Sequence, residues 1–503
     1  MTRHVLLLPV LVACQSSIED TAVLDDTAPL NDPLEWQPCD AVTDLLDDAA
    51  ASEECVIAMM PLQRDVEGSE EIEILVRRIP ATEPSRGQLW FLGGGPGAST
   101  AVYSEQLQML AEMAPDLDVY SLSHRGTLGS TILWCSELDG TGYYSSDCID
   151  ELEETWGDGL AGFSGVEAAL DVIELIRWEG EPEGEVIIHG LSYGGWWLNR
   201  ILQLAPELPT AVIWDGPSSA NMLDETAMWS VRRDEAIRRL MEDCAADATC
   251  ASWLGEDPYA TTSAVIDSYE DVCAFGDRLN AQAVLLALME HPDFRALIPG
   301  TVARMERCSE EDETDLITLN SWLNTYFNRN GYEYQESNTA LFELIRYSEM
   351  IAAASTSEQI LSYSSELISF YPYFESYSAS LYPLWPLYEV SLPGEWTGEM
   401  PPSLCIVGDY DSRTAHTACD ELEALFPGAE HQYVEMHNTS HSVLNAARQH
   451  DEALSCAVDV VSDFLADPEA PVGTACVDAL PRIDFSDDAV AAEYLPSGTA
   501  WPE

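Results

Sequence analysis

The chain has 503 residues, more than one hydrophobic core usually serves, so its length predicts two domains or one large domain with an insertion. Its 89 Asp and Glu residues stand against 21 basic residues, all of them Arg, which gives a formal net charge of −68. A surface of this charge repels polyanions, so nucleic acids and anionic membrane faces are excluded as partners. Adaptation to saline surroundings and a solvated surface selected for solubility explain the acidic composition equally well.

The first residues are expected to form an export signal. A short apolar run follows two basic residues and is too short to span a bilayer. It ends in Leu11-Val12-Ala13-Cys14, which resembles the bacterial lipobox, although an ordinary cleavage site beside a chance cysteine is the alternative. We therefore expect a signal peptide over residues 1–13, a lipid on Cys14 and an acidic flexible tether over residues 14–35. The protein would be an exported bacterial lipoprotein, periplasmic or at the cell surface.

The cysteine count indicates a disulfide framework. Of the 13 cysteines, twelve remain when Cys14 is set aside, and exported chains usually pair such an even number. A zinc site is not expected because no two pairs have the required short spacing, and no other metal or cofactor is predicted. Proximity along the chain suggests these pairs: Cys39 with Cys55, Cys135 with Cys148, Cys244 with Cys250, Cys405 with Cys419, and Cys456 with Cys476, leaving Cys273 and Cys308.

The first half of the chain alternates short β-rich runs with helical patterns, which is typical of a mainly parallel sheet covered by helices. The first strand alternates polar and apolar residues like an edge strand, and the later ones are compact apolar runs. Predicted strands cover residues 71–79, 88–92, 117–122, 185–189 and 210–214, and predicted helices cover 166–178 and 196–204.

The strand signal then disappears, and helical stretches such as 231–244 and 281–290 replace it, followed by a crowd of aromatic residues. The sheet pattern resumes later in the chain. A helical block between the sixth and seventh strands of such a sheet predicts a cap. The later predicted strands cover 403–407 and 432–435, and the later predicted helices cover 417–426 and 442–465. The predicted domains are a core over 36–215 and 398–480, a cap over 216–397 and an acidic C-terminal tail over 481–503.

A candidate nucleophile lies in Gly190-Leu191-Ser192-Tyr193-Gly194, which matches G-x-S-x-G. In this sharp strand-to-helix turn, glycines avoid collisions with the neighbouring strand and helix. The buried strand 186–188 precedes the motif and an apolar-faced helix follows it, as the turn requires. We therefore predict Ser192 as the nucleophile, with a glycine-lined structural turn as the alternative.

A serine nucleophile needs a histidine base held by a carboxylate, in the chain order Ser, acid, His. The loop after the last strand offers His437 and His441, and His441 is favoured because the last helix begins immediately after it. The preceding strand is followed by Asp409 and Asp411, and Asp411 is favoured because it stands three residues beyond Gly408 and can reach over the sheet. His437 and Asp409 stay as alternatives.

The oxyanion of a tetrahedral intermediate needs backbone N–H donors. The glycine run that begins at Gly93 follows the strand 88–92, where such a loop is expected. One donor is predicted from Gly94 or Gly95, and the other from the amide of Tyr193.

Several motifs together resemble the proline iminopeptidase and tripeptidyl aminopeptidase branch of the α/β hydrolases. They are Gly94-Gly95-Pro96-Gly97, His124-Arg125-Gly126-Thr127 with Gly129-Ser130, and the run 190–194; Trp36, Cys39, Cys55 before Met60-Pro61-Leu62, Cys244, Cys250, and Cys456 before 471–476 are similar to the tripeptidyl side. The resemblance spans residues 36–476. It implies an α/β-hydrolase fold and a serine exopeptidase that acts on peptide N-termini through an acyl-enzyme.

The chain departs from this family near the expected site. Ser123-His124 stands where an acidic residue is usual, and Gly195 stands where Thr is usual. In the cap, Tyr347 and Glu349 replace a Cys and an Asp. These changes leave the core chemistry in place and bear on the choice of substrate.

The leading hypothesis is an aminopeptidase, with a carboxylesterase or lipase as the alternative and a non-catalytic surface binding protein as a third. An aminopeptidase must bind the substrate's α-ammonium group, for which a cap carboxylate is the natural partner, and Glu349 is a candidate. Expected partners are peptides with a free N-terminus and, through the lipid on Cys14 alone, a membrane. We expect a monomer.

Overall fold

The computed structural model describes residues 34–46, 52–138, 144–179, 184–218, 228–268, 273–290, 293–329, 338–351, 356–370, 377, 379–390, 398–414, 416–426, 431–446 and 451–502. The predicted signal peptide, Cys14 and all but the last residues of the predicted tether lie outside this set.

The described residues contain one sheet with the strand order β1-β2-β3-β5-β4-β6-β7-β8-β9. The first three pairings in this order are antiparallel and all the others are parallel. With the two-residue β1 set aside, this is the topology of the α/β-hydrolase fold, as the sequence predicts. The strands are β1 Gln37–Pro38, β2 Glu54–Pro61, β3 Glu71–Ile79, β4 Gly87–Leu92, β5 Asp118–Leu122, β6 Glu185–Leu191, β7 Ala211–Asp215, β8 Ser403–Gly408 and β9 His431–Met436.

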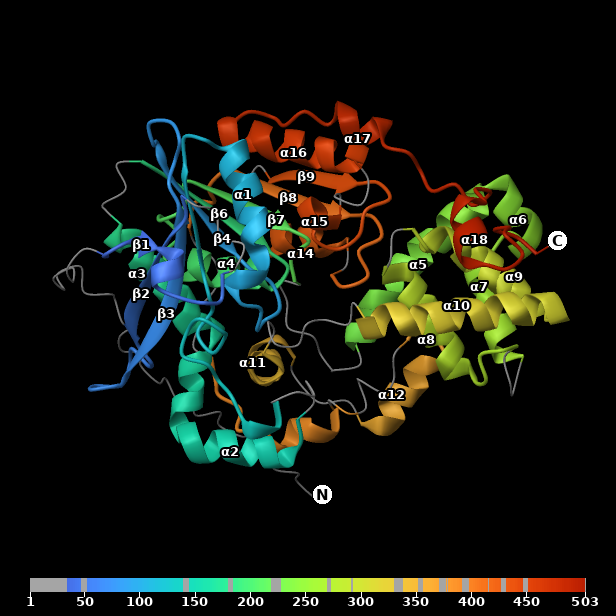
Figure 1. Ribbon diagram of the computed structural model, residues 1–503, viewed down its shortest axis with the longest axis horizontal. Helices are drawn as coiled ribbons and strands as arrows, with labels where there is room; N and C mark the ends of the chain where they lie inside the picture. Colours follow the sequence, from blue (N-terminus) through green and yellow to red (C-terminus); the bar gives the residue numbers. More distant parts are fainter. Residues whose placement is uncertain are drawn as a thin grey trace, which may run out of the picture.

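Helices cover both faces of the sheet, as Figure 1 shows for α1 and α16 on one face. In β4, Leu89 and Phe91 pack in the cluster that includes α1 and α16, whereas Trp90 and Leu92 pack in the cluster that includes α3 and α4. Burial on both faces explains why these strands read as continuous apolar runs. The core helices are α1 Ser104–Met113, α2 Ser146–Trp156, α3 Gly165–Trp178, α4 Tyr193–Leu204, α14 Ala418–Leu425, α15 Val443–Ala446, α16 Asp451–Ala466 and α17 Ala475–Ala479.

The prediction that residues 71–79 form an edge strand is wrong. β3 has these bounds, but β2 pairs along its whole length on one side and β5 pairs with its end on the other. β2 escapes prediction because, apart from Val56 and Ile57, its residues have little of the β-branched or aromatic character typical of strands.

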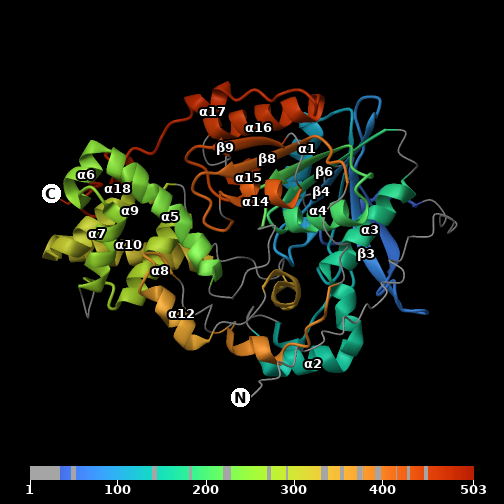
Figure 2. The same cartoon turned by 180° about the vertical axis from the view of Figure 1, so that it is seen from behind.

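The segment inserted between β7 and β8 is helical, as predicted, and packs in two parts. Helices α5 to α10 gather at one end of the molecule in both Figure 1 and Figure 2, around their own buried cluster. By contrast, Leu341 and Leu344 of α11 belong to the core cluster that includes α3 and α4. The inserted helices are α5 Met228–Ala246, α6 Ala248–Leu254, α7 Pro258–Asp267, α8 Arg278–Glu290, α9 Ile298–Arg307, α10 Glu310–Arg329, α11 Thr339–Ile345 and α12 Ser357–Ser364, with the π-helix η6 Arg346–Met350.

The short 3-10 helices connect these elements. They are η1 Cys39–Ala41, η2 Thr100–Tyr103, η3 Ser136–Leu138, η4 Gly157–Phe163, η5 Arg295–Leu297 and η7 Tyr382–Leu384.

The C-terminal segment, residues 481–502, runs from the core to the cap. Its helix α18 Ala489–Tyr494 lies among the cap helices, with the C-terminus beside α6 (Figure 1). Arg304 of α9 donates to the carbonyl oxygens of Ala500 at 2.8 Å and Thr499 at 2.6 Å. The side chains of Phe485 and Leu495 are buried in the cap cluster, so this segment links the cap to the core.

Removal of residues 481–503 is therefore expected to destabilise the cap. Burial of a large apolar side chain contributes about 1.5–3 kcal/mol, so the loss of Phe485 and Leu495 alone would cost several kcal/mol. We expect a lower Tm and preferential proteolysis within the cap helices of the truncated protein. A truncated protein with the Tm and cleavage pattern of the full chain would contradict this role.

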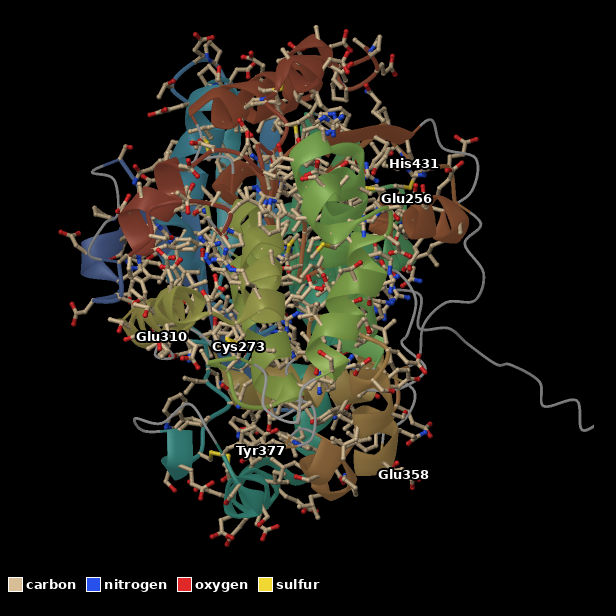
Figure 3. The ribbon with its side chains drawn as sticks, turned by 90° about the vertical axis from the view of Figure 1, so that its right-hand side faces the viewer. Glu256, Cys273, Glu310, Glu358, Tyr377 and His431 are labelled. Atoms are coloured by element: carbon tan, nitrogen blue, oxygen red, sulfur yellow. A yellow bond between two sulfur atoms is a disulfide. The ribbon has the colours of Figure 1, made fainter. Side chains whose placement is uncertain are left out.

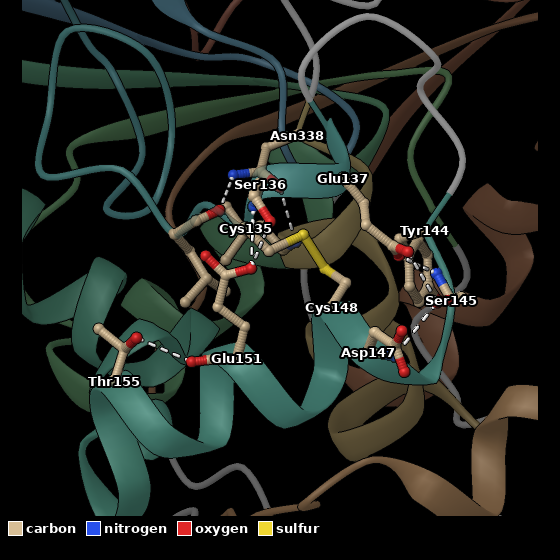
Figure 4. The surroundings of a disulfide bond; sticks show 12 residues. Cys135, Ser136, Glu137, Tyr144, Ser145, Asp147, Cys148, Glu151, Thr155 and Asn338 are labelled. Atoms are coloured by element: carbon tan, nitrogen blue, oxygen red, sulfur yellow. Dashed lines mark hydrogen bonds between the residues drawn. A yellow bond between two sulfur atoms is a disulfide. The ribbon is translucent and has the colours of Figure 1, made fainter.

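Six disulfides join the twelve cysteines of the described residues, and all five predicted pairs are among them. The two cysteines left over, Cys273 and Cys308, form the sixth. Figure 4 shows Cys135–Cys148, which ties the chain at η3 to the first turn of α2. Such a set of disulfides forms in an oxidising compartment and indicates export. In the described part of the chain, no helix combines the length and the apolar character that a membrane crossing requires.

The acidic residues largely face solvent. Glu256, Glu310 and Glu358 are exposed, and they are labelled on the view of the cap side in Figure 3. This surface accounts for the charge noted from the composition and leaves the few acids that are buried as informative exceptions.

Candidate active site

Ser192 lies at the end of β6, on the turn into α4. Its backbone has φ 55° and ψ −119°, a left-handed conformation that non-glycine residues rarely adopt. The Ser192 amide donates to the carbonyl oxygen of Asp215 at 3.0 Å, which holds the turn against the end of β7. Ser192 is half-buried, whereas its neighbours Leu191 and Tyr193 are buried, so the turn presents the serine at the surface of the site.

The glycines of this turn are required by close backbone contacts. A Cβ atom on Gly194 would lie 2.0 Å from the carbonyl oxygen of Leu92, and one on Gly190 would lie 2.5 Å from that of Gly194. Gly94 approaches from the opposite loop, where an added Cβ would lie 3.0 Å from Cβ of Ser192. The space around the serine is thus kept open by glycines on two separate loops.

Asp411 and His441 form an ion-pair geometry at the same edge of the sheet. His441 follows β9 and Asp411 follows β8. Nδ1 of His441 lies 2.8 Å from Oδ2 of Asp411. The other oxygen, Oδ1, accepts the amides of Arg413 and Thr414, both at 2.8 Å. An Nδ1 proton donated to the carboxylate leaves Nε2 as the acceptor nitrogen of the ring.

Thr414 and Gly216 complete the surroundings of this pair. The Thr414 hydroxyl lies 2.8 Å from Oδ2 of Asp411 and 3.1 Å from Nδ1 of His441, and it donates to the Gly216 carbonyl oxygen at 2.9 Å. A Cβ on Gly216 would lie 3.0 Å from Oδ2 of Asp411, so glycine at this position makes room for the carboxylate.

Within the described residues, Ser192 makes no hydrogen bond to His441. The two residues stand on the loops after β6 and β9, at the carboxyl edge of strands that run parallel through β7 and β8. Catalytic hydrogen bonds are commonly long in ligand-free sites and shorten when substrate binds. The geometry brings Asp411 and His441 into contact, and the hydrogen bond between His441 and Ser192 is not formed in this ligand-free site.

The structure distinguishes among the three backbone amides that are candidate oxyanion donors. The Gly94 amide already donates to the hydroxyl of Tyr103 at 2.8 Å. The amides of Gly95 and Tyr193 make no hydrogen bond within the described residues. Gly95 and Tyr193 therefore stay as the candidate pair, and Gly94 serves instead as the residue that lets the loop approach Ser192.

The Tyr193 hydroxyl contacts His124, which is one of the positions where the sequence departs from the family that it resembles. Burial lowers the pKa of His124 to about 4, so its ring is neutral at neutral pH. Nδ1 of His124 donates to the Arg125 carbonyl oxygen at 2.7 Å, which leaves Nε2 to accept from the Tyr193 hydroxyl at 3.2 Å. Burial, and then the charge of Glu349, raises the pKa of Tyr193 and keeps that hydroxyl protonated.

Glu349 lies in η6 and is buried, with 2% of its surface exposed. Its Oε1 accepts from the Gly165 amide at 2.6 Å and the Tyr388 hydroxyl at 2.7 Å. Its Oε2 lies 3.8 Å from Nε of Arg200. The carboxylate is thus engaged within the protein, and the prediction that it binds substrate finds no support in its surroundings.

A different cap carboxylate, Glu290 at the end of α8, lies close enough to His441 for their charges to interact. It pairs with Arg233 of α5 and lies 3.9 Å from Nη2 of Arg413. Although burial opposes it, these two arginines lower the pKa of Glu290 below its ordinary value, so the carboxylate is charged at neutral pH. Sequence patterns missed Glu290 because one acid among many in the cap carries no local signal.

The alternative base and acid, His437 and Asp409, form a second pair. Nδ1 of His437 lies 3.5 Å from Oδ2 of Asp409, and Nε2 lies 2.9 Å from the Arg482 guanidinium. The Asp409 carboxylate also accepts the Thr439 amide at 3.2 Å. The contacts of Arg482 with His437 and of Asp409 with the Thr439 amide are arranged to hold the loop that carries His441.

Among the described residues, one group of potential metal ligands lies close together: Cys273, Cys308 and Glu313. Its two cysteines are joined in a disulfide, so neither offers a thiolate. The group is not a metal site.

Comparison with known proteins shows similar folds and nothing more. No family model matches the sequence, and no curated protein matches it either. Solved structures with a similar fold include a 2-hydroxy-6-oxo-6-phenylhexa-2,4-dienoate hydrolase from Rhodococcus sp. strain RHA1, with 13% identity, a TM-score of 0.33, and 81% of this chain and 99% of that chain covered. Another is the esterase RhEst1 from Rhodococcus sp. ECU1013, with 15% identity, a TM-score of 0.34, and coverage of 82% and 98%.

A third is a thermophilic esterase from Thermogutta terrifontis, with 14% identity, a TM-score of 0.30, and coverage of 82% and 100%. Each of these structures is matched over nearly its full length. At such identities and TM-scores, the activities of these proteins carry no argument about this chain. The function must be inferred from the site itself.

Proposed function

We propose that the protein is a serine hydrolase that acts through an acyl-enzyme. The observation that carries this proposal is the pair of Asp411 and His441, 2.8 Å apart, beside a serine held at a positive φ on a glycine-lined turn. A structural turn has no need of a histidine and a buried carboxylate at the same edge of the sheet.

In this mechanism, Ser192 Oγ attacks the substrate carbonyl while Nε2 of His441 accepts its proton. Asp411 keeps the ring oriented and stabilises the imidazolium that forms. The amides of Gly95 and Tyr193 donate to the oxyanion, and such donors are typically worth about 3–4 kcal/mol of barrier each. His441 then protonates the leaving group, and a water molecule attacks the acyl-enzyme by the reverse sequence of proton transfers.

Within this class, we propose that the substrate is a peptide with a free N-terminus. The support is the resemblance to the aminopeptidase branch together with a charged cap carboxylate, Glu290, that is within electrostatic reach of His441. A partly buried carboxylate attracts an ammonium group more strongly than an exposed one does. In this proposal, Glu290 takes the role that the sequence assigned to Glu349.

An esterase or lipase is the second candidate, and one observation favours it. Glu290 is already paired with Arg233, and Arg413 is nearby, so this cap acid is compensated by two cations. A neutral acyl group would need no change in this arrangement.

Acetylation of the substrate N-terminus separates the two candidates. We expect the acetylated peptide amide to be hydrolysed about 10–100 times less efficiently than the free one, because a charge-assisted hydrogen bond contributes about 1.5–3 kcal/mol. Glu290→Gln should remove most of this difference, whereas Glu349→Gln serves as the matched control and should preserve it. Equal kcat/KM for both substrates, with rapid hydrolysis of a simple ester, would replace the aminopeptidase with the esterase.

A further inference from the structure

Arg295 extends from the cap to the loops that carry the candidate acid and base. It is the first residue of η5, between α8 and α9, and its side chain is completely buried. Its Nη2 donates to the hydroxyl of Ser440, the residue before His441. Its guanidinium carbon lies 5.3 Å from the ring centroid of Tyr410, the residue before Asp411. One cap residue thus contacts both loops immediately beside the candidate triad.

The position of Arg295 is maintained by packing on the cap side. The preceding Phe294 makes edge-to-face contacts with Trp322, at 4.5 Å between ring centroids, and with Tyr494 of α18, at 4.8 Å. Such aromatic contacts are worth about 0.5–1.5 kcal/mol beyond their buried area. Tyr494 belongs to the C-terminal segment, so Arg295 is fixed by the same contacts that link the cap to the core.

Tyr410 provides a second connection at this point. Its hydroxyl donates to Oδ2 of Asp243 of α5 at 2.5 Å, and its ring is buried in the cap cluster. The loop after β8 is therefore attached to α5 through Tyr410, and the loop after β9 is attached to η5 through Ser440. A shift of the cap would move both loops.

The charge of Arg295 acts in a region without solvent. Burial lowers its pKa to about 10, against the attraction of Asp409, Asp293 and Asp411, so the guanidinium is still protonated at neutral pH. A fixed cation next to the loop of His441 disfavours a second positive charge on the imidazole.

We propose that Arg295 is a positioning residue for the candidate triad: it holds Ser440 and Tyr410 so that His441 and Asp411 stay aligned, and its charge favours the neutral imidazole of His441. This inference rests on the proposed serine hydrolase function. It also gives the cap a second role besides substrate binding, because the cap would set the state of the base.

Other charged groups face His441 as well, and they stay the same in the variants described next. Asp411 and Arg413 come from the loop after β8, and Glu290 from α8, paired with Arg233 of α5. Asp215 at the end of β7 accepts the Val443 amide at 2.6 Å and so lies beside the same loop. Because these groups carry both positive and negative charges, the effect of Arg295 must be measured by removing its charge alone.

The test is the pH dependence of the rate at which a fluorophosphonate probe labels Ser192. Arg295→Gln keeps a hydrogen-bond donor for Ser440 without the charge, and Arg295→Lys keeps the charge. We expect the midpoint of the acid limb to move up by about one pH unit in Arg295→Gln, which is about a tenfold slower labelling rate below the midpoint. Arg295→Lys should keep the midpoint of the wild-type protein.

Arg304→Gln is the matched control, since Arg304 is also buried in the cap but pairs with Asp315 at 2.8 Å, away from the triad loops. It should lower the Tm and leave the acid limb unchanged. An acid limb in Arg295→Gln equal to that of the wild type would overturn the inference, as would an equal shift in Arg304→Gln. Wild-type protein that is not labelled at any pH would overturn the proposed function instead.

A double-mutant cycle covers the case in which Arg295→Gln does not fold. Arg295→Lys and Ser440→Ala each weaken the same contact, so their effects on the labelling rate should be less than additive when combined. Additive effects would show that the two residues act independently and would contradict the positioning role.

Discussion

Ser192→Ala is expected to abolish probe labelling and to reduce turnover by about four to six orders of magnitude, because removal of the nucleophile of a triad leaves only the contribution of the oxyanion site and of substrate binding. Alanine keeps the Cβ atom of serine and removes only its hydroxyl. The fold should therefore be preserved, with a Tm close to that of the wild type. The measurements are gel detection of a fluorophosphonate probe and hydrolysis of ester and amide p-nitrophenyl or p-nitroanilide substrates.

Ser218→Ala is the matched control for this experiment. Ser218 lies beside the same turn, where its backbone amide donates to the Ser192 carbonyl oxygen at 2.9 Å, a bond that the substitution retains. We expect labelling and turnover to stay within a few-fold of the wild type. If Ser192→Ala were still labelled and active, another serine would be the nucleophile and the proposed mechanism would be wrong. If the wild type were neither labelled nor active, the binding-protein hypothesis would gain support.

The sheet could be predicted from the sequence to within one or two residues at most strand ends, because parallel strands buried on both faces read as compact apolar runs. The predicted strand 403–407, for example, became β8 Ser403–Gly408. Pairing was harder to predict. Nothing within residues 71–79 indicates that another strand lies on the far side, since alternation reports burial of one face and not the neighbours in the sheet.

The candidate nucleophile, acid and base could be predicted from the sequence for a different reason. Each occupies a short stretch whose place along the chain is set by the strand before it, and the fold supplies the order in which they follow. His124 illustrates where this reasoning ends. It was visible as a departure from a family motif, but its contact with the Tyr193 hydroxyl connects residues 69 positions apart and depends on how α4 lies over the sheet.

Glu290 and Arg295 could not be predicted at all. Both lie in the inserted segment, and their proximity to His441 and Ser440 depends on the way the cap packs on the loops after β8 and β9. Side chains that matter through long-range contact leave no periodic or motif signal in their own segment. The cap is therefore the part of the molecule where the structure adds most to the sequence.

His441→Gln and His437→Gln should have very different consequences, although the two histidines are four residues apart on one loop. His441 contacts Asp411 at 2.8 Å, whereas His437 is directed at Asp409 and Arg482. Loss of the base should lower turnover by about three to six orders of magnitude. Loss of His437 should cost no more than a few-fold, through the loop that it supports.

The pH dependence adds a second, independent measure. Only neutral imidazole accepts the serine proton, so wild-type activity should rise with pH as His441 loses its proton, and His437→Gln should keep this rise. In His441→Gln, the residual activity should lose it, because glutamine does not titrate. An active His441→Gln together with a silent His437→Gln would transfer the role of base to His437, and Asp409 would then become the acid, since it is the carboxylate that His437 faces.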